Sequence, residues 1–140
     1  MLRGIDSLLT PDLLHSLAAM GHGDRIAIVD ANFPAASSAR RVHHLAGVDA
    51  AAVLRAVLSV LPLDDFIPDP AVTMQVVGDA AAVPDAVAEF ARILAAQNGP
   101  APVAIDRFAF YDVAKTAYAV VQTGETRLYG NIILSKGVIR

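Results

Sequence analysis

The spacing of hydrophobic positions along the chain alternates between a helical period and short continuous apolar runs. In the first helical segment, Leu13, Leu14 and Leu17 fall on one face at spacings of three and four residues. Thr10 and Pro11 form a typical helix start, because Thr caps the free N–H groups and Pro fits the first helical position. Gly21 is a natural C-cap. The pattern therefore predicts a helix over residues 11–20.

The same reasoning predicts elements along the rest of the chain. Helices are predicted from Asp49 to the break at Pro62, from Pro84 to Gly99, and, less regularly, over residues 108–115. Short β-branched runs predict strands at residues 26–29, 72–77, 103–105, 118–122 and 128–134. Residues 31–47 are rich in turn formers and are expected to be irregular. The last two strands flank residues 123–126 (TGET), a pattern of either a hairpin or a short crossover.

Helices that alternate with short apolar strands indicate a layered α/β fold. The length of 140 residues is typical of one domain, so we expect a single domain over residues 1–140. Hydrophobic residues make up 55% of the chain and charged residues 18%, which is apolar for a monomer. Although many of these residues are alanine, the balance favours a homo-oligomer in which sister subunits cover part of the surface.

Charge and composition argue against several classes of protein. The net charge is −3 and no basic run is longer than Arg40–Arg41, which argues against binding to nucleic acid. The chain has no cysteine, so disulfides, thiolate catalysis and cysteine metal sites are excluded. No apolar run has the ~20 residues of a membrane helix, and the start of the sequence lacks the pattern of a signal peptide. A cytoplasmic protein with no membrane partner is therefore expected.

The first candidate for chemistry is His22, in the turn MGHGD at residues 20–24 between a predicted helix and a predicted strand. Histidine titrates near neutral pH and can pass a proton in both directions, and flanking glycines allow a ligand to approach the backbone. His22 could instead cap the preceding helix. Asp30, at the end of the following strand, could orient the imidazole, bind a hydroxyl, or cap its own loop.

Polar and aromatic residues elsewhere are compatible with a pocket for a polyol. Tyr129 and Asn131 flank a glycine, and together they offer a flat ring, a hydroxyl and an amide. Arg107 could bind a sugar oxygen or pair with a nearby carboxylate. Asp64 could be catalytic or lie in a solvated turn. His43 and His44 lack a further ligand group at recognisable spacing, so a metal site is not expected.

Several short motifs resemble the L-fucose mutarotase family, within the wider group that includes D-ribose pyranase. These motifs occur in the same order across nearly the whole chain: residues 2–5 (LRGI), 8–14 (LLTPDLL), 20–24 (MGHGD), 30–34 (DANFP), 61–64 (LPLD), 107–111 (RFAFY), 123–125 (TGE) and 129–134 (YGNIIL). Each motif is weak alone, and the ordered set is specific. The resemblance implies a three-layer α/β/α subunit assembled into a ring, commonly a decamer, with sites between neighbouring subunits.

The resemblance also implies an activity and roles for residues. The activity is the interconversion of the α and β anomers of a free sugar, without metal or organic cofactor. The implied catalytic side chains are His22, as proton donor, with Tyr111 and Tyr129. The implied substrate-binding residues are Asp30, Asp64, Met74, Arg107 and Asn131.

One segment departs from the family pattern. After residues 30–34 the family often has Arg-Ala-Asp-Gly, where this chain has HHLAG at residues 43–47. If this loop lines the pocket, the preferred sugar differs from L-fucose; if it lies at the ring interface, only assembly contacts change. Two alternatives to the mutarotase therefore stay open: a ribose pyranase type of enzyme, and a non-catalytic module that binds monosaccharides.

Overall fold

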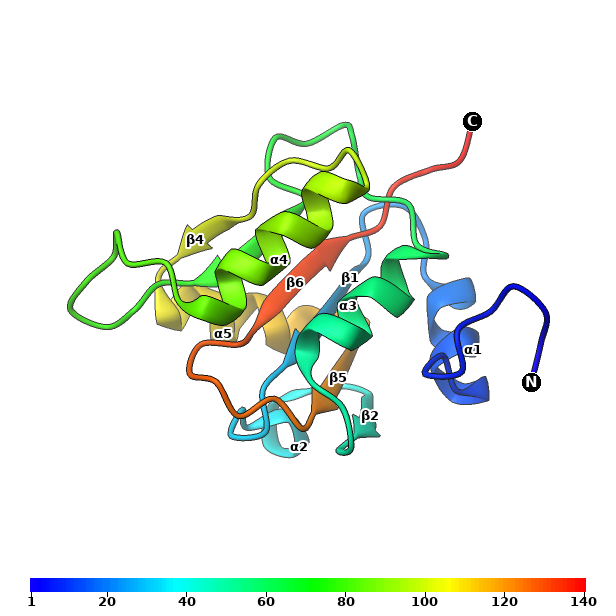
Figure 1. Cartoon of the computed structure of the whole chain (residues 1–140), viewed down its shortest axis with the longest axis horizontal. Coiled ribbons are helices and arrows are strands. Elements are labelled where there is room, and N and C mark those ends of the chain that lie inside the picture. Colours follow the sequence, from blue (N-terminus) through cyan, green and yellow to red (C-terminus); the bar gives the residue numbers. More distant parts are fainter.

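The computed structural model describes all 140 residues, and its six strands join one mixed sheet in the order β2-β5-β1-β6-β3-β4. The strands are β1 (Arg25–Val29), β2 (Val42–Leu45), β3 (Ala71–Met74), β4 (Val103–Ile105), β5 (Ala119–Thr123) and β6 (Ile132–Ser135). The β2–β5, β5–β1 and β3–β4 pairs are parallel, whereas β6 runs antiparallel to both of its neighbours. Five strands therefore point one way and β6 points the other way (Figure 1).

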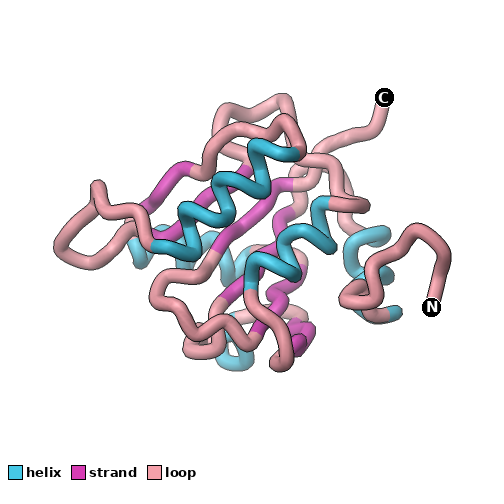
Figure 2. Tube along the Cα trace, in the orientation of Figure 1, coloured by secondary structure: helices cyan, strands magenta, loops and turns pink.

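Helices cover both faces of the sheet, which confirms the three-layer α/β/α expectation (Figures 1 and 2). One face packs against α1 (Pro11–Ala19), α3 (Ala50–Leu58) and α4 (Asp85–Ala96), and the other against α2 (Ala35–Ser38) and α5 (Arg107–Thr116). Successive residues of a strand point to opposite faces, so Ile26 and Ile28 enter the first core while Ala27 and Val29 enter the second. A strand buried on both faces needs a continuous apolar run, as β1 has.

Capping side chains in the sequence predicted the starts of α1 and α3 correctly. The Thr10 hydroxyl accepts a hydrogen bond from the Leu13 N–H at 3.3 Å, and the Asp49 carboxylate accepts one from the Ala52 N–H at 2.7 Å. The Asp106 carboxylate caps α5 in the same way. Each acceptor satisfies a backbone donor that has no partner within its helix, which is why these side chains occur at helix starts.

Some expectations were wrong. Residues 31–47 are not irregular throughout, because α2 and the edge strand β2 lie within them. The first helix ends without glycine: Met20 is its C-cap, in extended conformation, so Gly21 does not cap it. The strand predicted over residues 72–77 stops at Met74, and α3 stops at Leu58, before Pro62.

The connection between the last two strands is a crossover and not a hairpin. β1 lies between β5 and β6, and it pairs with both of them. Gly124, which begins this crossover, donates its N–H to the Val48 carbonyl oxygen at 2.7 Å. A Cβ at position 124 would overlap the Ala46 carbonyl oxygen, so the close approach requires glycine here.

We therefore expect Gly124→Ala to lower the free energy of unfolding by about 2–3 kcal/mol, because backbone must move to relieve the overlap. Urea unfolding followed by circular dichroism measures this change. Gly47→Ala is the matched control, because a Cβ at position 47 meets no atom within 4 Å. An equal effect of the two substitutions would contradict the steric explanation.

Candidate active site

The sequence-predicted site residues divide between two opposite edges of the sheet. The five co-directional strands end at one edge, here called the carboxyl edge, and begin at the other, the amino edge. His22 and Asp64 lie at the amino edge. Near the carboxyl edge lie Asp30, Met74, Arg107, Tyr111, Tyr129 and Asn131. The five residues of β1, about 16 Å of extended chain, separate the two groups.

His22 is at the corner of a tight turn. The Asp24 N–H donates to the Gly21 carbonyl oxygen at 3.2 Å, and Gly23 has a φ of +82°, a value that favours glycine. The Gly23 N–H also donates to the Lys136 carbonyl oxygen at 2.8 Å, which fixes the turn to the end of β6. The backbone beneath the imidazole is therefore held at both ends of the turn.

His22 does not cap the helix that precedes it. The ammonium group of Lys136 donates to the carbonyl oxygens of Leu17 and Met20 at 2.8 and 2.6 Å, at the C-terminal end of α1. A cation is favoured there because the carbonyls lack partners within the helix. Lys136 thus takes the structural role that His22 could have had, and the imidazole stays available for other contacts.

The partner of His22 within the chain is Asp64, not Asp30. The His22 Nε2 lies 3.1 Å from Oδ1 of Asp64, whose side chain is only 3% exposed while that of His22 is 45% exposed. The pairing forms because the Asp64 N–H donates to the Ser135 carbonyl oxygen, next to the Lys136 that holds the His22 turn. Of the three roles that the sequence left open for Asp30, orienting the imidazole of its own chain does not occur, because these residues lie at opposite edges.

The carboxylate of Asp64 is held in its ionised form. The N–H of Phe66 donates to Oδ1 at 3.0 Å, and this bond, with the smaller contribution of His22, lowers the pKa of Asp64 although burial opposes it. An ionised carboxylate only accepts hydrogen bonds, so the proton of the bond must be on Nε2 of His22. Nδ1 is then the ring nitrogen left to exchange a proton with a ligand.

Asp30 and Asn131 form a buried pair at the carboxyl edge. The Asn131 amide donates to Oδ2 of Asp30 at 2.9 Å, and its Oδ1 accepts from the Asp30 N–H at 2.9 Å. Oδ1 of Asp30 accepts from the Asn32 N–H at 2.9 Å, the loop-capping contact that the sequence also allowed. The pair links the end of β1 to the start of β6 and leaves carboxylate lone pairs for a further donor.

Tyr129 is held in an unusual conformation beside this pair. Its φ of +60° is rare outside glycine and asparagine, and its hydroxyl oxygen accepts a hydrogen bond from the Val77 N–H at 3.1 Å. Since the oxygen accepts that bond, the phenolic proton stays free to be donated elsewhere. Backbone strain of this kind occurs most often where a side chain must be aimed at a ligand.

The remaining predicted residues near this edge differ in accessibility. Met74 is buried in the second core with Phe110, and Tyr111 is half-buried with its ring 5.5 Å from that of Phe33. Arg107 is half-buried and forms no ion pair with a carboxylate; its guanidinium lies over the Phe108 ring. Arg107 also lines a depression of about 370 Å³ with residues 75–80, where its charge is free to meet a ligand.

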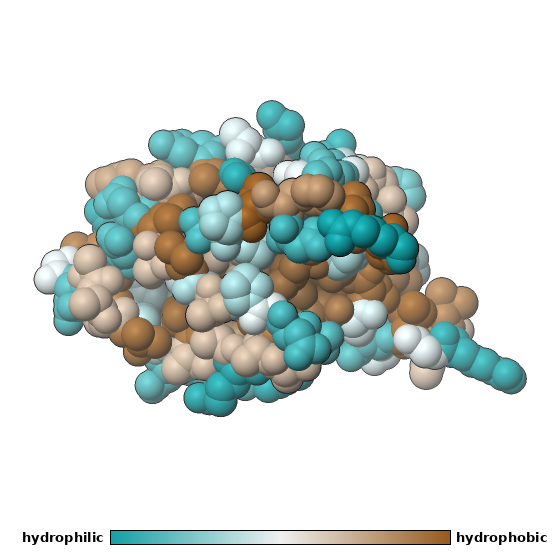
Figure 3. All heavy atoms as spheres, turned by 90° about the horizontal axis from the view of Figure 1, so that it is seen from above, coloured by the Kyte–Doolittle hydropathy of each residue, from teal (hydrophilic) through white to brown (hydrophobic).

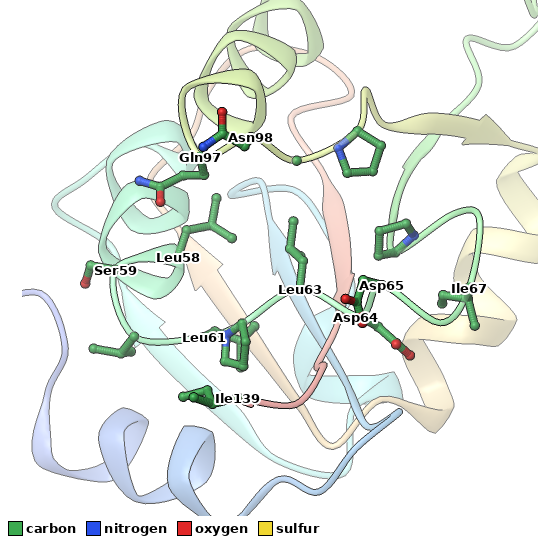
Figure 4. Close-up of a pocket in the computed structure, with 15 residues that line it drawn as sticks. Leu58, Ser59, Leu61, Leu63, Asp64, Asp65, Ile67, Gln97, Asn98 and Ile139 are labelled. Atoms are coloured by element: carbon green, nitrogen blue, oxygen red, sulfur yellow. The ribbon is translucent and has the colours of Figure 1, made fainter.

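No single cavity of the chain holds all these groups. A larger depression of about 430 Å³ lies between the ends of α3 and α4 and the loop after α3 (Figure 4). It is lined mainly by aliphatic and proline side chains, and Asp64, at one end, is the only predicted site residue in it. Nor does any group of three or more His, Asp or Glu side chains have the arrangement of a metal site.

The structure adds one residue that the sequence analysis missed. The ring of Phe66 lies 5.2 Å from the imidazole of His22, centroid to centroid, and is tilted by 54°. The two residues are far apart in the sequence, and no local pattern marks Phe66 as functional. Only the packing of the loop after α3 against the His22 turn brings them together.

The chain is similar to known proteins over almost its whole length. The profile of the RbsD / FucU transport protein family matches residues 3–139. The chain belongs to this family. An L-fucose mutarotase of Glaesserella parasuis is 46% identical over 99% of this chain and 96% of its own, and the human fucose mutarotase is 43% identical over 99% and 94%.

Solved structures of the family have the same fold. The crystal structure of the fucose mutarotase of Streptococcus pneumoniae in complex with L-fucose superposes with a TM-score of 0.93 at 37% identity, covering 99% of this chain and 100% of that one. RbsD of Bacillus subtilis, solved with D-ribose, shares the fold at a TM-score of 0.78 and 21% identity. No helix of this chain has the length and hydropathy needed to cross a membrane.

Proposed function

We propose that this chain is a mutarotase that interconverts the α and β anomers of L-fucose or a closely related free monosaccharide. The observation that carries the proposal is His22, set on a rigid glycine turn and paired with the buried Asp64. This pair occurs in a chain that is 37% identical, over nearly its whole length, to a fucose mutarotase crystallised with L-fucose.

The reaction needs an acid and a base at the same time. Protonation of the ring oxygen and loss of the anomeric hydroxyl proton break the bond between the anomeric carbon and the ring oxygen. Rotation about the first carbon–carbon bond of the open chain, followed by reclosure, then gives the other anomer. Each catalytic group must give a proton in one direction and take it in the other, which favours a histidine beside an ionised partner.

In this proposal Nδ1 of His22 exchanges a proton with the sugar, because the proton on Nε2 stays in the hydrogen bond to Asp64. The second proton carrier is Tyr129, whose hydroxyl proton is free, with Tyr111 as a further catalytic contact. Asp30, Asn131 and Arg107 bind sugar hydroxyls at the carboxyl edge. Asp64 and Met74 complete the predicted binding set, Asp64 acting mainly through His22.

The site is shared between subunits. His22 and Tyr129 of one chain lie at opposite edges of the sheet, too far apart to act on one sugar ring. The amino edge of one subunit must therefore meet the carboxyl edge of the next, and a head-to-tail contact that repeats with rotation closes a ring. Exposed apolar side chains support such contacts at both edges: Phe66 and Ile139 at the amino edge, Val77 and Phe108 at the carboxyl edge.

Figure 3 shows that hydrophobic side chains reach the surface between hydrophilic ones on the face seen from above. A homodecamer, in which two rings stack, is the assembly we expect. Cytoplasmic location and a reaction without cofactor are part of the same proposal. Light scattering and cell fractionation test assembly and location.

Mixing two inactive variants tests the shared site. His22→Ala removes one half of every site and Tyr129→Phe the other. Random co-assembly after co-expression should restore about a quarter of the wild-type activity, because half the partners on each side are intact. Each variant alone serves as control. If the mixture stays inactive although both variants assemble, the site lies within one subunit and this proposal fails.

The function itself is tested by proton NMR saturation transfer between the anomeric signals of L-fucose, with ribose and rhamnose in parallel. Faster exchange of the fucose anomers supports the mutarotase. Enhancement for ribose only would identify a pyranase, and binding without enhancement for any sugar would identify a non-catalytic module. The panel also tests whether the segment at residues 43–47, which includes β2, changes the preferred sugar.

A further inference from the structure

The imidazole of His22 contacts the ring of Phe66 as well as the carboxylate of Asp64. The proposed function assigns no role in catalysis to this aromatic contact. Asp64 holds one ring nitrogen, but a single hydrogen bond allows the ring to rotate about it. The side chain of His22 is 45% exposed, so packing within its own turn does not restrict it. Phe66 is the one aromatic ring in contact with the imidazole, at 5.2 Å.

Phe66 is itself placed by two independent contacts. Its N–H donates to the same Oδ1 of Asp64 that accepts from His22, so the backbone at Phe66 and the imidazole share one anchor. On the ring side, the guanidinium of Arg140 lies 5.0 Å from the Phe66 centroid, within the range of a cation–π contact. Phe66 is 63% exposed in the single chain, so packing within its own subunit restrains it little apart from these contacts.

Arg140 is fixed in turn by Asp65. Both terminal nitrogens of the guanidinium donate to the two carboxylate oxygens, at 2.9 and 3.0 Å, in the bidentate geometry that orients an arginine most firmly. Exposed ion pairs add little to stability, so this pair has no clear value for the fold alone. The bidentate pair with Asp65 does, however, keep the guanidinium group of Arg140 over the Phe66 ring.

We propose that Phe66 and Arg140 are positioning residues for His22, linked in the order Asp65, Arg140, Phe66, His22. Asp64 sets which nitrogen carries the proton, and the Phe66 ring sets the plane of the imidazole, so that Nδ1 points in one direction. A small loss of alignment of a proton carrier lowers the rate of transfer strongly while substrate binding changes little. The expected effect on the rate of anomer exchange rests on the proposed function, whereas the effect on the position of the imidazole does not.

The kinetic test uses substitutions along this series of contacts. Phe66→Ala should lower kcat for anomer exchange about tenfold with KM within about twofold, and Phe66→Tyr should restore most of the rate. Arg140→Ala and Asp65→Asn should each lower kcat by about threefold, because Phe66 remains but is less restrained. Arg41→Ala is the matched control: its guanidinium also lies over an aromatic ring, that of Tyr118, at 4.1 Å on the β2–β5 side of the sheet.

A second readout needs no sugar. In protein labelled with ¹³C-histidine, the signal of the His22 ring, assigned by its loss in His22→Ala, reports the surroundings of the imidazole. Arg140→Ala should shift or broaden that signal although Arg140 forms no hydrogen bond or ion pair with His22, whereas Arg41→Ala should not. Circular dichroism confirms that the variants are folded, and light scattering confirms that they assemble as the wild type does.

The outcomes separate this inference from the proposed function. If the wild type does not accelerate exchange of any sugar, the proposed function fails while the NMR test of positioning still stands. An unchanged His22 signal in Arg140→Ala, or an unchanged kcat in Phe66→Ala, would overturn the positioning role. A raised KM with unchanged kcat in Phe66→Ala would show instead that Phe66 binds the sugar directly.

Discussion

His22→Ala is expected to lower the enzymatic rate of fucose anomer exchange by about 10²–10⁴-fold, the usual contribution of one positioned acid–base group. The imidazole of His22 is 45% exposed at the amino edge, and histidine is the side chain that most often acts as a general acid and base. Saturation transfer between the anomeric proton signals measures the loss. The fold and assembly should stay intact, because the turn is held by backbone hydrogen bonds that alanine also forms.

His15→Ala is the matched control for this experiment. His15 is exposed on α1 and its ring forms no hydrogen bond, so its removal tests the general effect of losing a histidine. We expect an unchanged rate. If His22→Ala kept the wild-type rate, another group would carry the proton, and the Asp64–His22 pair would have only a structural role.

Glu125→Gln is expected to lower the free energy of unfolding by about 3 kcal/mol at neutral pH, the lower end for breaking a buried ion pair. The carboxylate of Glu125 is 2% exposed and accepts from Nε, a terminal nitrogen and the backbone N–H of Arg127 at 2.9 Å each. Its Oε2 also accepts from the Ala50 N–H, at the start of α3. The amide of glutamine can satisfy only part of this set. Arg127, with its side chain 35% exposed, recovers some hydration, which limits the loss.

The pH dependence of this difference in the free energy of unfolding follows from the same contacts. The hydrogen bonds from Arg127 lower the pKa of Glu125 to about 2 from its ordinary 4.5. A carboxyl group whose pKa is lower in the folded state stabilises the fold fully above its unfolded pKa, and this stabilisation disappears as the pH falls. The difference in stability between wild type and Glu125→Gln should therefore be largest above pH 4.5 and shrink as the pH falls toward 2.

Glu89→Gln provides the comparison within the same network. Glu89 bridges Arg55 and Arg127 on the surface, with its side chain 24% exposed, so we expect a loss of about 1 kcal/mol or less. Urea unfolding at several pH values measures both variants. Equal losses for the two would show that burial of Glu125 contributes nothing.

Much of the fold could be predicted from the sequence because the signals are local. A capping side chain acts on N–H groups two or three residues away, as Thr10 and Asp49 do, and a continuous apolar run marks β1 whatever its neighbours are. The glycines around His22 likewise define its turn within four residues. Local energy terms decide these features, so a single sequence contains them.

Other features depend on contacts between distant segments, and the sequence alone left them open. Residues 123–126 fit a hairpin or a crossover equally well, and the choice came from β1 pairing on both sides. The extended Met20, not Gly21, is the C-cap of α1, and Lys136 from the end of the chain donates to carbonyl oxygens there. Each of these outcomes needs a partner that lies elsewhere in the chain.

The candidate site shows the same contrast between local features and contacts of distant segments. The sequence by itself indicated which residue types carry the chemistry: a histidine in a glycine turn, tyrosines, and polar side chains at strand ends. Only the tertiary structure decided that His22 pairs with Asp64 and contacts the ring of Phe66, and that Tyr129 and Asn131 lie at the opposite edge. The physical reason is that hydrogen bonds and ring contacts act over a few ångströms, and only the packing of the whole sheet sets which distant residues come that close.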